Sequence, residues 1–418
     1  MTDTTSGIRL QSIDRWRGAP LPFKALAIGM LASYLPGLLP GGLGVSVSYL
    51  GWIIPLLGCG LVAINRLRRI SFPIKLWLPW LIWVLAYLVF AEADNALQRS
   101  VMLLTPLVVG AGVSTLAVNM ALIDQFAVWL NRFFWIFLAT AGVSTGLLVS
   151  GQLAGASGFA AGSITASLLA VWYAARYADR DAHALYYWSA LTLVPVLANT
   201  RTGMVAVALT LPLTLSALSI KKRLMVVAVL VVAGGLVFQT EHIQNKMFYS
   251  GQGTFADAVA GVTGLFGGEQ TSSGDLATSG RKSMNDALVA RLDQSYWFGF
   301  GANTTEAISL AIAGVTHPHN DWLRVRYEYG MLGLLIFAST MLVQMRHAYR
   351  RAKWLHSSRA AIFLYAGAGS FIPMAIFMGS DNVMLYAAWF GNLQFAMLGL
   401  GYAALKSRLL ANAQGVAL

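Results

Sequence analysis

Residues 203–239 read GMVAVALTLPLTLSALSI-KKR-LMVVAVLVVAGGLVFQ, two apolar runs separated by three adjacent cations. The runs, 203–220 and 224–239, approach the ~20 residues that cross a bilayer as a helix. A transmembrane β-strand needs only ~9–11 residues, so runs of this length favour helices. The stretch therefore predicts two transmembrane helices joined by a short basic turn.

The composition of the whole chain agrees with this prediction. Of its 418 residues, 57% are hydrophobic and 11% are charged, whereas soluble domains carry about 25% charged residues. A water-facing surface for the entire molecule cannot be built from so few charges, and disorder is excluded as well. The one cysteine, Cys59, allows no intrachain disulfide.

The predicted fold class is an all-α polytopic membrane protein with about twelve transmembrane helices and one large loop. We expect these helices near 22–39, 43–64, 76–91, 101–119, 132–150, 159–178, 183–199, 203–220, 224–239, 320–345, 360–379 and 383–405. Residues 1–21 would form an N-terminal segment, 22–239 the first nine helices, 240–319 the loop, 320–405 the last three helices, and 406–418 a tail. The polar start and the lack of a cleavage site predict an uncleaved first helix.

The basic residues predict the orientation. If the N-terminus is cytoplasmic, 21 of the 29 basic residues fall on the cytoplasmic side, which agrees with the positive-inside rule. Both termini would then be cytoplasmic and the loop would be outside. The orientation of the helices in the membrane accounts for the excess of basic over acidic residues. Nucleic acid binding is therefore not needed to explain it, and membrane lipids are the expected partners. The eight outer cations are Arg99, Arg201, Lys246, Arg281, Lys282, Arg291, Arg324 and Arg326.

The loop 240–319 combines a glycine-rich part with a helical part. Residues 250–280 are rich in Gly, Ser and Thr, which is typical of a mobile segment, and within them 255–266 could form a short amphipathic helix. In 282–295, Met284, Leu288 and Leu292 recur at helical spacing, with Val289 added to that face. Basic and aromatic residues in such a loop suggest a substrate lid.

His319 is the first candidate for chemistry. It precedes a predicted helix on which His319, Leu323, Arg326, Gly330 and Gly333 would form one stripe. The two glycines would let another element approach closely. A neutral imidazole at the water interface can accept a proton, although a lone interfacial histidine more often only hydrogen-bonds.

Arg201 and Arg281 are the next candidates. Arg201 lies between two apolar runs, where a cation is costly unless it is paired or hydrated; an anionic partner is favoured over a snorkelling anchor. Arg281 offers the planar donors that match phosphate oxygens, or it is a solvated loop charge. Asp381, in the last outer turn, could orient His319 or pair with an arginine, but a plain turn residue is the simpler interpretation. We expect Arg291 and Arg324 to pair with Asp293, Glu328 or Asp321.

Several common motifs are missing from the sequence. It contains no P-loop, no G-x-G-x-x-G after a strand, no H-E-x-x-H and no D-x-D-like acidic cluster for Mg²⁺. No metal and no other cofactor is therefore expected.

Three segments together resemble a known family. His319-Asn320, nine residues, and Gly330-Met331-Leu332-Gly333 match the pattern His-Asn-x9-Gly-x-x-Gly of the superfamily of O-antigen ligases, O-antigen polymerases and protein O-oligosaccharyltransferases. Thr200-Arg201-Thr202-Gly203 resembles the family's arginine turn. Ser279-Gly280-Arg281 and Trp297-Phe298-Gly299-Phe300-Gly301 resemble its loop segment. The resemblance covers residues 185–345 by motif.

The resemblance implies a glycosyltransferase of GT-C architecture in a bacterial inner membrane, with its active site facing the periplasm. The implied donor is a glycan on undecaprenyl pyrophosphate, and the transfer needs no metal. His319 matches the catalytic histidine, Arg201 and Arg281 match the essential arginines, and Asp381 matches more loosely. The expected substrate-binding residues are Lys282, Asn320, Arg291, Arg326 and Asp381.

One dominant loop between the ninth and tenth helices resembles the O-antigen ligase, whose acceptor is the lipid A–core oligosaccharide. An O-antigen polymerase or a protein O-oligosaccharyltransferase would use the same residues. A transporter or flippase of a lipid-linked anionic glycan would also use outer arginines but would leave the histidine pattern unexplained. A cell-wall polymerase fits less well, because the outer loop shows no evident catalytic carboxylate.

Overall fold

A computed structural model describes residues 18–413, except 35–42, 90, 92, 150–156, 199, 215–218, 242–243, 246–247, 249–252, 255–280 and 356–358. The predicted lid 250–280, with the short helix expected over 255–266, lies almost wholly outside the described residues. So does most of the predicted N-terminal segment, 1–21.

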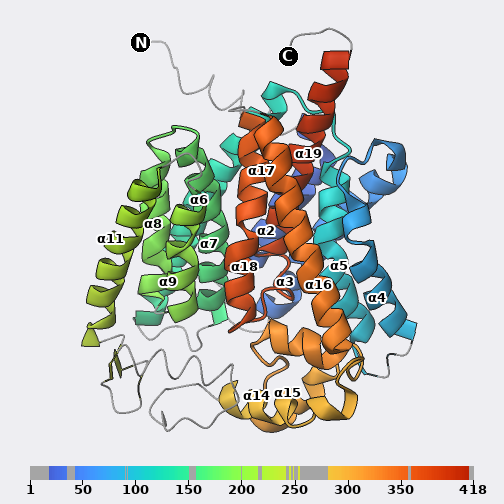
Figure 1. Ribbon diagram of the computed structural model, residues 1–418, viewed down its shortest axis with the longest axis vertical. Coiled ribbons are helices and arrows are strands. Elements are labelled where there is room, and N and C mark those ends of the chain that lie inside the picture. Colours follow the sequence, from blue (N-terminus) through green and yellow to red (C-terminus); the bar gives the residue numbers. More distant parts are fainter. Residues whose placement is uncertain are drawn as a thin grey trace.

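The described residues form a bundle of helices (Figure 1). In chain order these are α2 (Leu21–Tyr34), α3 (Leu43–Asn65), α4 (Leu78–Val89), α5 (Ala96–Val113), α6 (Met120–Val149), α7 (Ser157–Ala178), α8 (Ala184–Leu197), α9 (Arg201–Ala208), α10 (Thr210–Thr214), α11 (Ile220–Phe238), α14 (Arg281–Val289), α15 (Thr305–Ala313), α16 (Asp321–Trp354), α17 (Arg359–Gly369), α18 (Phe371–Met378) and α19 (Gly391–Ala413). Short 3₁₀ turns occupy Leu67–Arg69, Ile74–Leu76 and Leu292–Ser295.

Four helical stretches in the described part are long and apolar enough to cross a membrane: Ala96–Val113, Met120–Val143, Asp321–Trp354 and Arg359–Met378. Shorter apolar helices accompany them, at Leu21–Tyr34, Tyr49–Asn65, Ile74–Val89 and Ala184–Leu197. The structure thus fits a helical membrane protein, as predicted; twelve spans and the GT-C architecture stay predictions.

The surface of the bundle is apolar where lipid would contact it. On α11, Leu224, Val229, Val232 and Leu236 are all at least 61% exposed. Large apolar side chains exposed along a whole helix are unfavourable in water but suit a hydrocarbon solvent. The interior contains α7, whose residues from Ile164 to Ala175 are buried.

α14 and α15 lie beyond one end of the bundle, which we call the loop end (Figure 1). We call the other end, where α16 finishes and α17 begins, the far end. The loop helices are anchored by the predicted apolar face, since Met284, Leu288 and Leu292 are buried. Val289 was wrongly assigned to that face: it is 48% exposed.

Several predicted helices differ from the observed ones. The fifth, expected over 132–150, begins at Met120, and the eleventh, expected over 360–379, is divided into α17 and α18. The eighth, expected over 203–220, is divided into α9 and α10. The last, expected from residue 383, begins at Gly391, and residues 380–390 form turns instead. Polar side chains stabilise these turns: Asp381 Oδ1 accepts from the Asn382 N–H at 2.8 Å, and Asp321 Oδ2 accepts from the Met384 N–H at 2.7 Å.

Candidate functional site

His319 lies just before α16 and not on it. Its φ is 53°, in the left-handed region, and Asn320 is the N-cap, whose side chain accepts from the Leu323 N–H at 3.0 Å. A side-chain oxygen at the N-cap satisfies a free amide of the first helical turn. The predicted single stripe is therefore wrong, because His319 precedes the helix and Gly330 interrupts it with φ 73° and ψ 179°.

The interruption at Gly330 gives a packing reason for two of the sequence motifs, Trp297–Gly301 and Gly330–Gly333. Segment 296–301 fills the break: the Phe300 and Gly301 N–H groups each donate at 2.9 Å to the carbonyls of Tyr327 and Glu328, and Met331 N–H donates to Tyr296 O at 2.9 Å. These bonds replace those that the helix loses. A Cβ on Gly330 would lie 2.1 Å from the Trp297 carbonyl oxygen, so only glycine fits there. Gly333 instead admits Trp83 of α4, as predicted for a close approach.

His319 contacts the turn that follows α18. Its Nδ1 lies 3.4 Å from Asp381 Oδ1 and 3.3 Å from the Asn382 side-chain amide. Asp381 is buried, whereas the His319 side chain is 28% exposed. A buried carboxylate at Nδ1 orients the ring and leaves Nε2 for a proton from outside. Of the two roles considered for Asp381, the geometry supports orientation of His319.

Two helix N-termini, those of α9 and α14, contact the same turn through Thr202 and Arg281. Arg201 is the first residue of α9 and Arg281 the first of α14. Arg281 Nη1 donates to the carbonyl of Ser380 at 2.8 Å, and the hydroxyls of Thr202 and Ser380 are 2.5 Å apart. Burial and the nearby charge of Arg281 lower the pKa of the Arg201 guanidinium. Cations and free amide donors at two helix N-termini make a place suited to an anion.

A buried network holds α16 against this turn. Asp321 and Arg324 are 2.9 Å apart and both are buried, which confirms the expected pairing of Arg324. Trp322 Nε1 donates to the carbonyl of Ala375 at 2.9 Å, and Glu328 accepts from the Thr305 hydroxyl at 2.5 Å. Because Asp321 also holds Met384, the segment that carries His319 and the turn that carries Asp381 are fixed to each other.

His317, the other histidine of His317-Pro318-His319, has a different environment from His319. Burial and the charges of Arg99 and Arg324 lower the pKa of His317 to about 3. Its Nε2 lies 3.1 Å from the Thr316 hydroxyl. A base this weak is protonated only in acid, so His317 is a poor proton acceptor near neutral pH.

The remaining predicted site residues have other environments. Lys282 and Arg291 are exposed, and the ion pairs of the described part do not include the expected one for Arg291. Arg326 is half-buried, with its guanidinium 5.3 Å from the Tyr296 ring centroid. Asn320 has a structural role as the N-cap. Sequence reasoning missed Ser380 and Asn382, although a polar Ser-Asp-Asn run between apolar stretches was a visible signal.

Metal-binding clusters are also absent from what the structure describes: no group of three or more His, Cys, Asp or Glu side chains there could hold a metal ion. The site's chemistry is that of one imidazole, one buried carboxylate and two guanidiniums.

A family comparison covers most of these residues. Residues 186–338 match the family model for O-antigen ligase. The family expected from the three motifs is thereby confirmed for this region, which runs from α8 into α16 and contains Arg201, Arg281 and His319. The O-antigen ligase match ends before Asp381, so the inclusion of Asp381 in the candidate site depends on its contact with His319. No curated protein matches the chain.

Proposed function

We propose that this protein is an O-antigen ligase. It transfers an O-antigen polysaccharide from undecaprenyl pyrophosphate to a hydroxyl of the lipid A–core oligosaccharide at the periplasmic face of the inner membrane. The proposal includes GT-C architecture, about twelve spans and cytoplasmic termini. One observation carries it: side chains from α9, α14 and the start of α16 meet at the turn Ser380–Asn382.

In this proposal His319 is the general base. Asp381 would accept a hydrogen bond from Nδ1–H, which leaves Nε2 free to take the proton of the acceptor hydroxyl. The side-chain nitrogen Nδ2 of Asn382 lies 3.3 Å from the same Nδ1. With this amide turned over, Oδ1, which is buried without a hydrogen-bond partner among the described residues, would accept from Nδ1–H. Base catalysis of this kind contributes ~10²–10⁴ in rate.

Arg201 and Arg281 would hold the pyrophosphate. As the bond from the anomeric carbon to the pyrophosphate oxygen breaks, that oxygen takes the electron pair and negative charge grows on the leaving group. Fixed guanidiniums away from bulk water stabilise this charge strongly. The bound anion would also offset the repulsion that lowers the pKa of Arg201. The acceptor oxygen attacks from the opposite side, so one displacement inverts the anomeric centre.

Ligation by the purified protein, with a defined undecaprenyl-pyrophosphate donor and a lipid A–core acceptor, tests the proposal. The informative variant is His319→Asn, because Asn tolerates the left-handed backbone that His319 adopts. We expect a loss of ~10²–10⁴ in rate. His317→Asn is the matched control and should retain most activity, since His317 is a weak base.

The acceptor separates this proposal from its alternatives. If a second lipid-linked glycan is extended while lipid A–core is not modified, the protein is a polymerase. Donor movement across vesicles without a new glycosidic bond would indicate a flippase. Ligation that His319→Asn leaves at the wild-type rate would remove the assignment of the base.

The proposal also needs no metal. Treatment with a chelator should leave the ligation rate unchanged, because guanidiniums carry out the charge stabilisation that Mg²⁺ supplies elsewhere. A rate that falls with chelator and returns with Mg²⁺ would contradict this part of the mechanism.

A further inference from the structure

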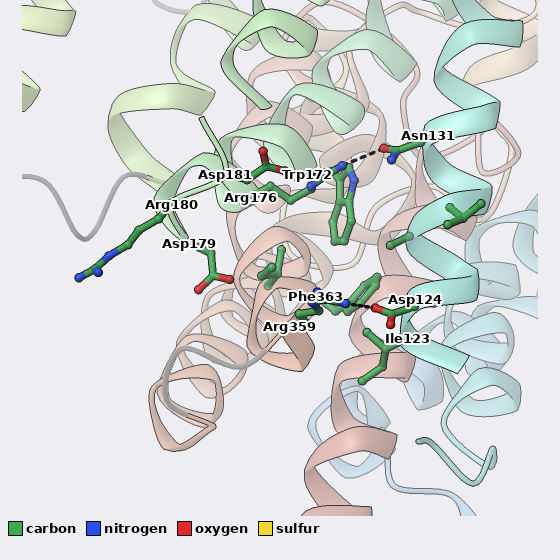
Figure 2. Close-up of a pocket in the computed structure, with 13 residues that line it drawn as sticks. Ile123, Asp124, Asn131, Trp172, Arg176, Asp179, Arg180, Asp181, Arg359 and Phe363 are labelled. Carbon is green, nitrogen blue, oxygen red and sulfur yellow. Dashed lines mark hydrogen bonds and ion pairs between the residues drawn. The ribbon is translucent and has the colours of Figure 1, made fainter. Parts of the chain in front are cut away.

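The far end of the bundle contains a cavity that the proposed glycan transfer does not use. It has a volume of about 530 Å³ and lies between the start of α6, the end of α7 and the start of α17 (Figure 2). Trp172, Phe363 and Ile123 form part of an apolar wall. The cavity is thus on the side of the molecule away from His319 and its partners.

The polar lining of the cavity is balanced in charge. Three arginines and three aspartates line it: Arg176, Arg180, Arg359, Asp124, Asp179 and Asp181. Arg359 Nη1 lies 2.6 Å from Asp124 Oδ1, and Arg176 pairs with Asp181. The side chains of the third couple, Arg180 and Asp179, form no ion pair or hydrogen bond that is seen in the described part. Burial raises the pKa of the Asp179 carboxyl, and the charges of Arg180 and Arg359 oppose that rise.

An unsatisfied donor lies in the inner wall. Trp172 is only 2% exposed, and its Nε1–H has no hydrogen-bond partner in the parts of the chain that are described. Figure 2 shows the ring beside the Arg176 guanidinium, which donates to Asn131 Oδ1 at 2.8 Å. A buried donor without an acceptor costs ~1–3 kcal/mol, so an acceptor oxygen from a ligand would be stabilised here.

We propose that this cavity binds a zwitterionic phospholipid headgroup of the phosphoethanolamine type. The phosphate would accept from Trp172 Nε1–H and Arg176, since guanidinium and indole donors match phosphate oxygens. The ammonium group would donate to Asp179. The acyl chains would follow the apolar wall into the bilayer, and a headgroup with no net charge suits a lining whose charges sum to zero.

Lipid retention measured by native mass spectrometry tests the proposal. The delipidated protein is titrated in detergent with phosphatidylethanolamine, phosphatidylcholine and phosphatidylglycerol of matched acyl chains. We expect phosphatidylethanolamine to bind about tenfold more tightly than phosphatidylcholine, which has no N–H donor for Asp179. Phosphatidylglycerol has no cation at all. Equal or tighter binding of either lipid would overturn the zwitterionic headgroup.

Two variants locate the binding. Asp179→Asn should abolish the preference for phosphatidylethanolamine over phosphatidylcholine. Trp172→Phe should weaken the binding of all three lipids, because it keeps an aromatic side chain but removes the indole N–H. Arg350→Gln, an exposed arginine of the far end outside the cavity lining, is the matched control and should change nothing. If Asp179→Asn keeps the preference for phosphatidylethanolamine, Asp179 does not bind the ammonium group. This variant should fold, because Asp179 is a partly exposed turn residue and not part of the core.

A separate arm of the same experiment asks whether the ligand is a membrane lipid or a soluble compound with the same headgroup. Soluble phosphoethanolamine should bind at least about tenfold more weakly than the lipid, because it has no chains for the apolar wall. Equal affinity would mean that the ligand is not a membrane lipid. His319→Asn should retain the lipid preference, because the two sites lie at different ends of the bundle.

Discussion

At the far end of the bundle, arginines are matched with carboxylates, whereas at the loop end two arginines are brought close to each other. Arg176 and Arg359 have acidic partners at the far end. At the loop end, the charge of Arg281 lowers the pKa of Arg201, and Arg281 donates to a neutral carbonyl. Like charges held close together cost free energy unless an anion joins them. The site at the loop end is therefore suited to an anion, whereas the charges that line the far-end cavity sum to zero.

After His319→Asn, the largest effect should come from Arg281→Lys. Lysine keeps the charge but loses the planar donors that bind two phosphate oxygens and the Ser380 carbonyl. Removal of one fixed donor to a developing anion costs ~10²–10³ in rate, so we expect a loss of that order in the ligation assay. Lys282→Ala, at the exposed neighbour, is the control. If both variants are as active as the wild type, Arg281 is only a surface charge.

A smaller loss should follow Asp381→Asn. The variant keeps the shape of the turn but no longer fixes the Nδ1 proton of His319 or stabilises the imidazolium that forms. A hydrogen bond to a charged group contributes ~1.5–3 kcal/mol, which corresponds to a rate loss of roughly 10- to 100-fold. The steady-state rate constant should fall while the apparent affinity for donor is kept. A loss confined to donor affinity would show that Asp381 binds substrate instead.

The two candidate arginines and the histidine were predicted from sequence, but their meeting point was not. Residue type and the short patterns around Arg201, Arg281 and His319 are local features and can be recognised along the chain. A short turn around Asp381 was predicted, but its full extent depends on tertiary contacts, among them Asp321 with the Met384 amide. Hydropathy predicts a helix from residue 383, where the turns continue to residue 390. The same limit applies to Gly330, where an unbroken helical period gave no sign of the break.

The third prediction concerns stability at that break. Gly330→Ala would force a side chain into the left-handed region, which costs ~1–3 kcal/mol, and its Cβ would also clash with the Trp297 carbonyl. We expect a lower midpoint of thermal unfolding in detergent, together with reduced ligation, because segment 296–301 would leave the helix. Gly234→Ala on α11 is the control, since its Cβ would meet no atom within 4 Å. Equal melting of the two variants would contradict the close packing at Gly330.

The smallest effect is expected at the far end, in the pair Arg359–Asp124. Its side chains are 64% and 45% exposed, and exposed ion pairs contribute only ~0.2–1 kcal/mol to stability. A double-mutant cycle with Arg359→Gln and Asp124→Asn, measured by unfolding in detergent, should give a coupling energy in that range. The buried pair Arg324–Asp321 is 4% and 0% exposed, and removal of one partner from such a pair costs ~3–5 kcal/mol. A coupling energy of several kcal/mol at Arg359–Asp124 would show that lipid or protein shields this pair from water. The two ends would then differ in the ligands that they bind and not in their exposure to water.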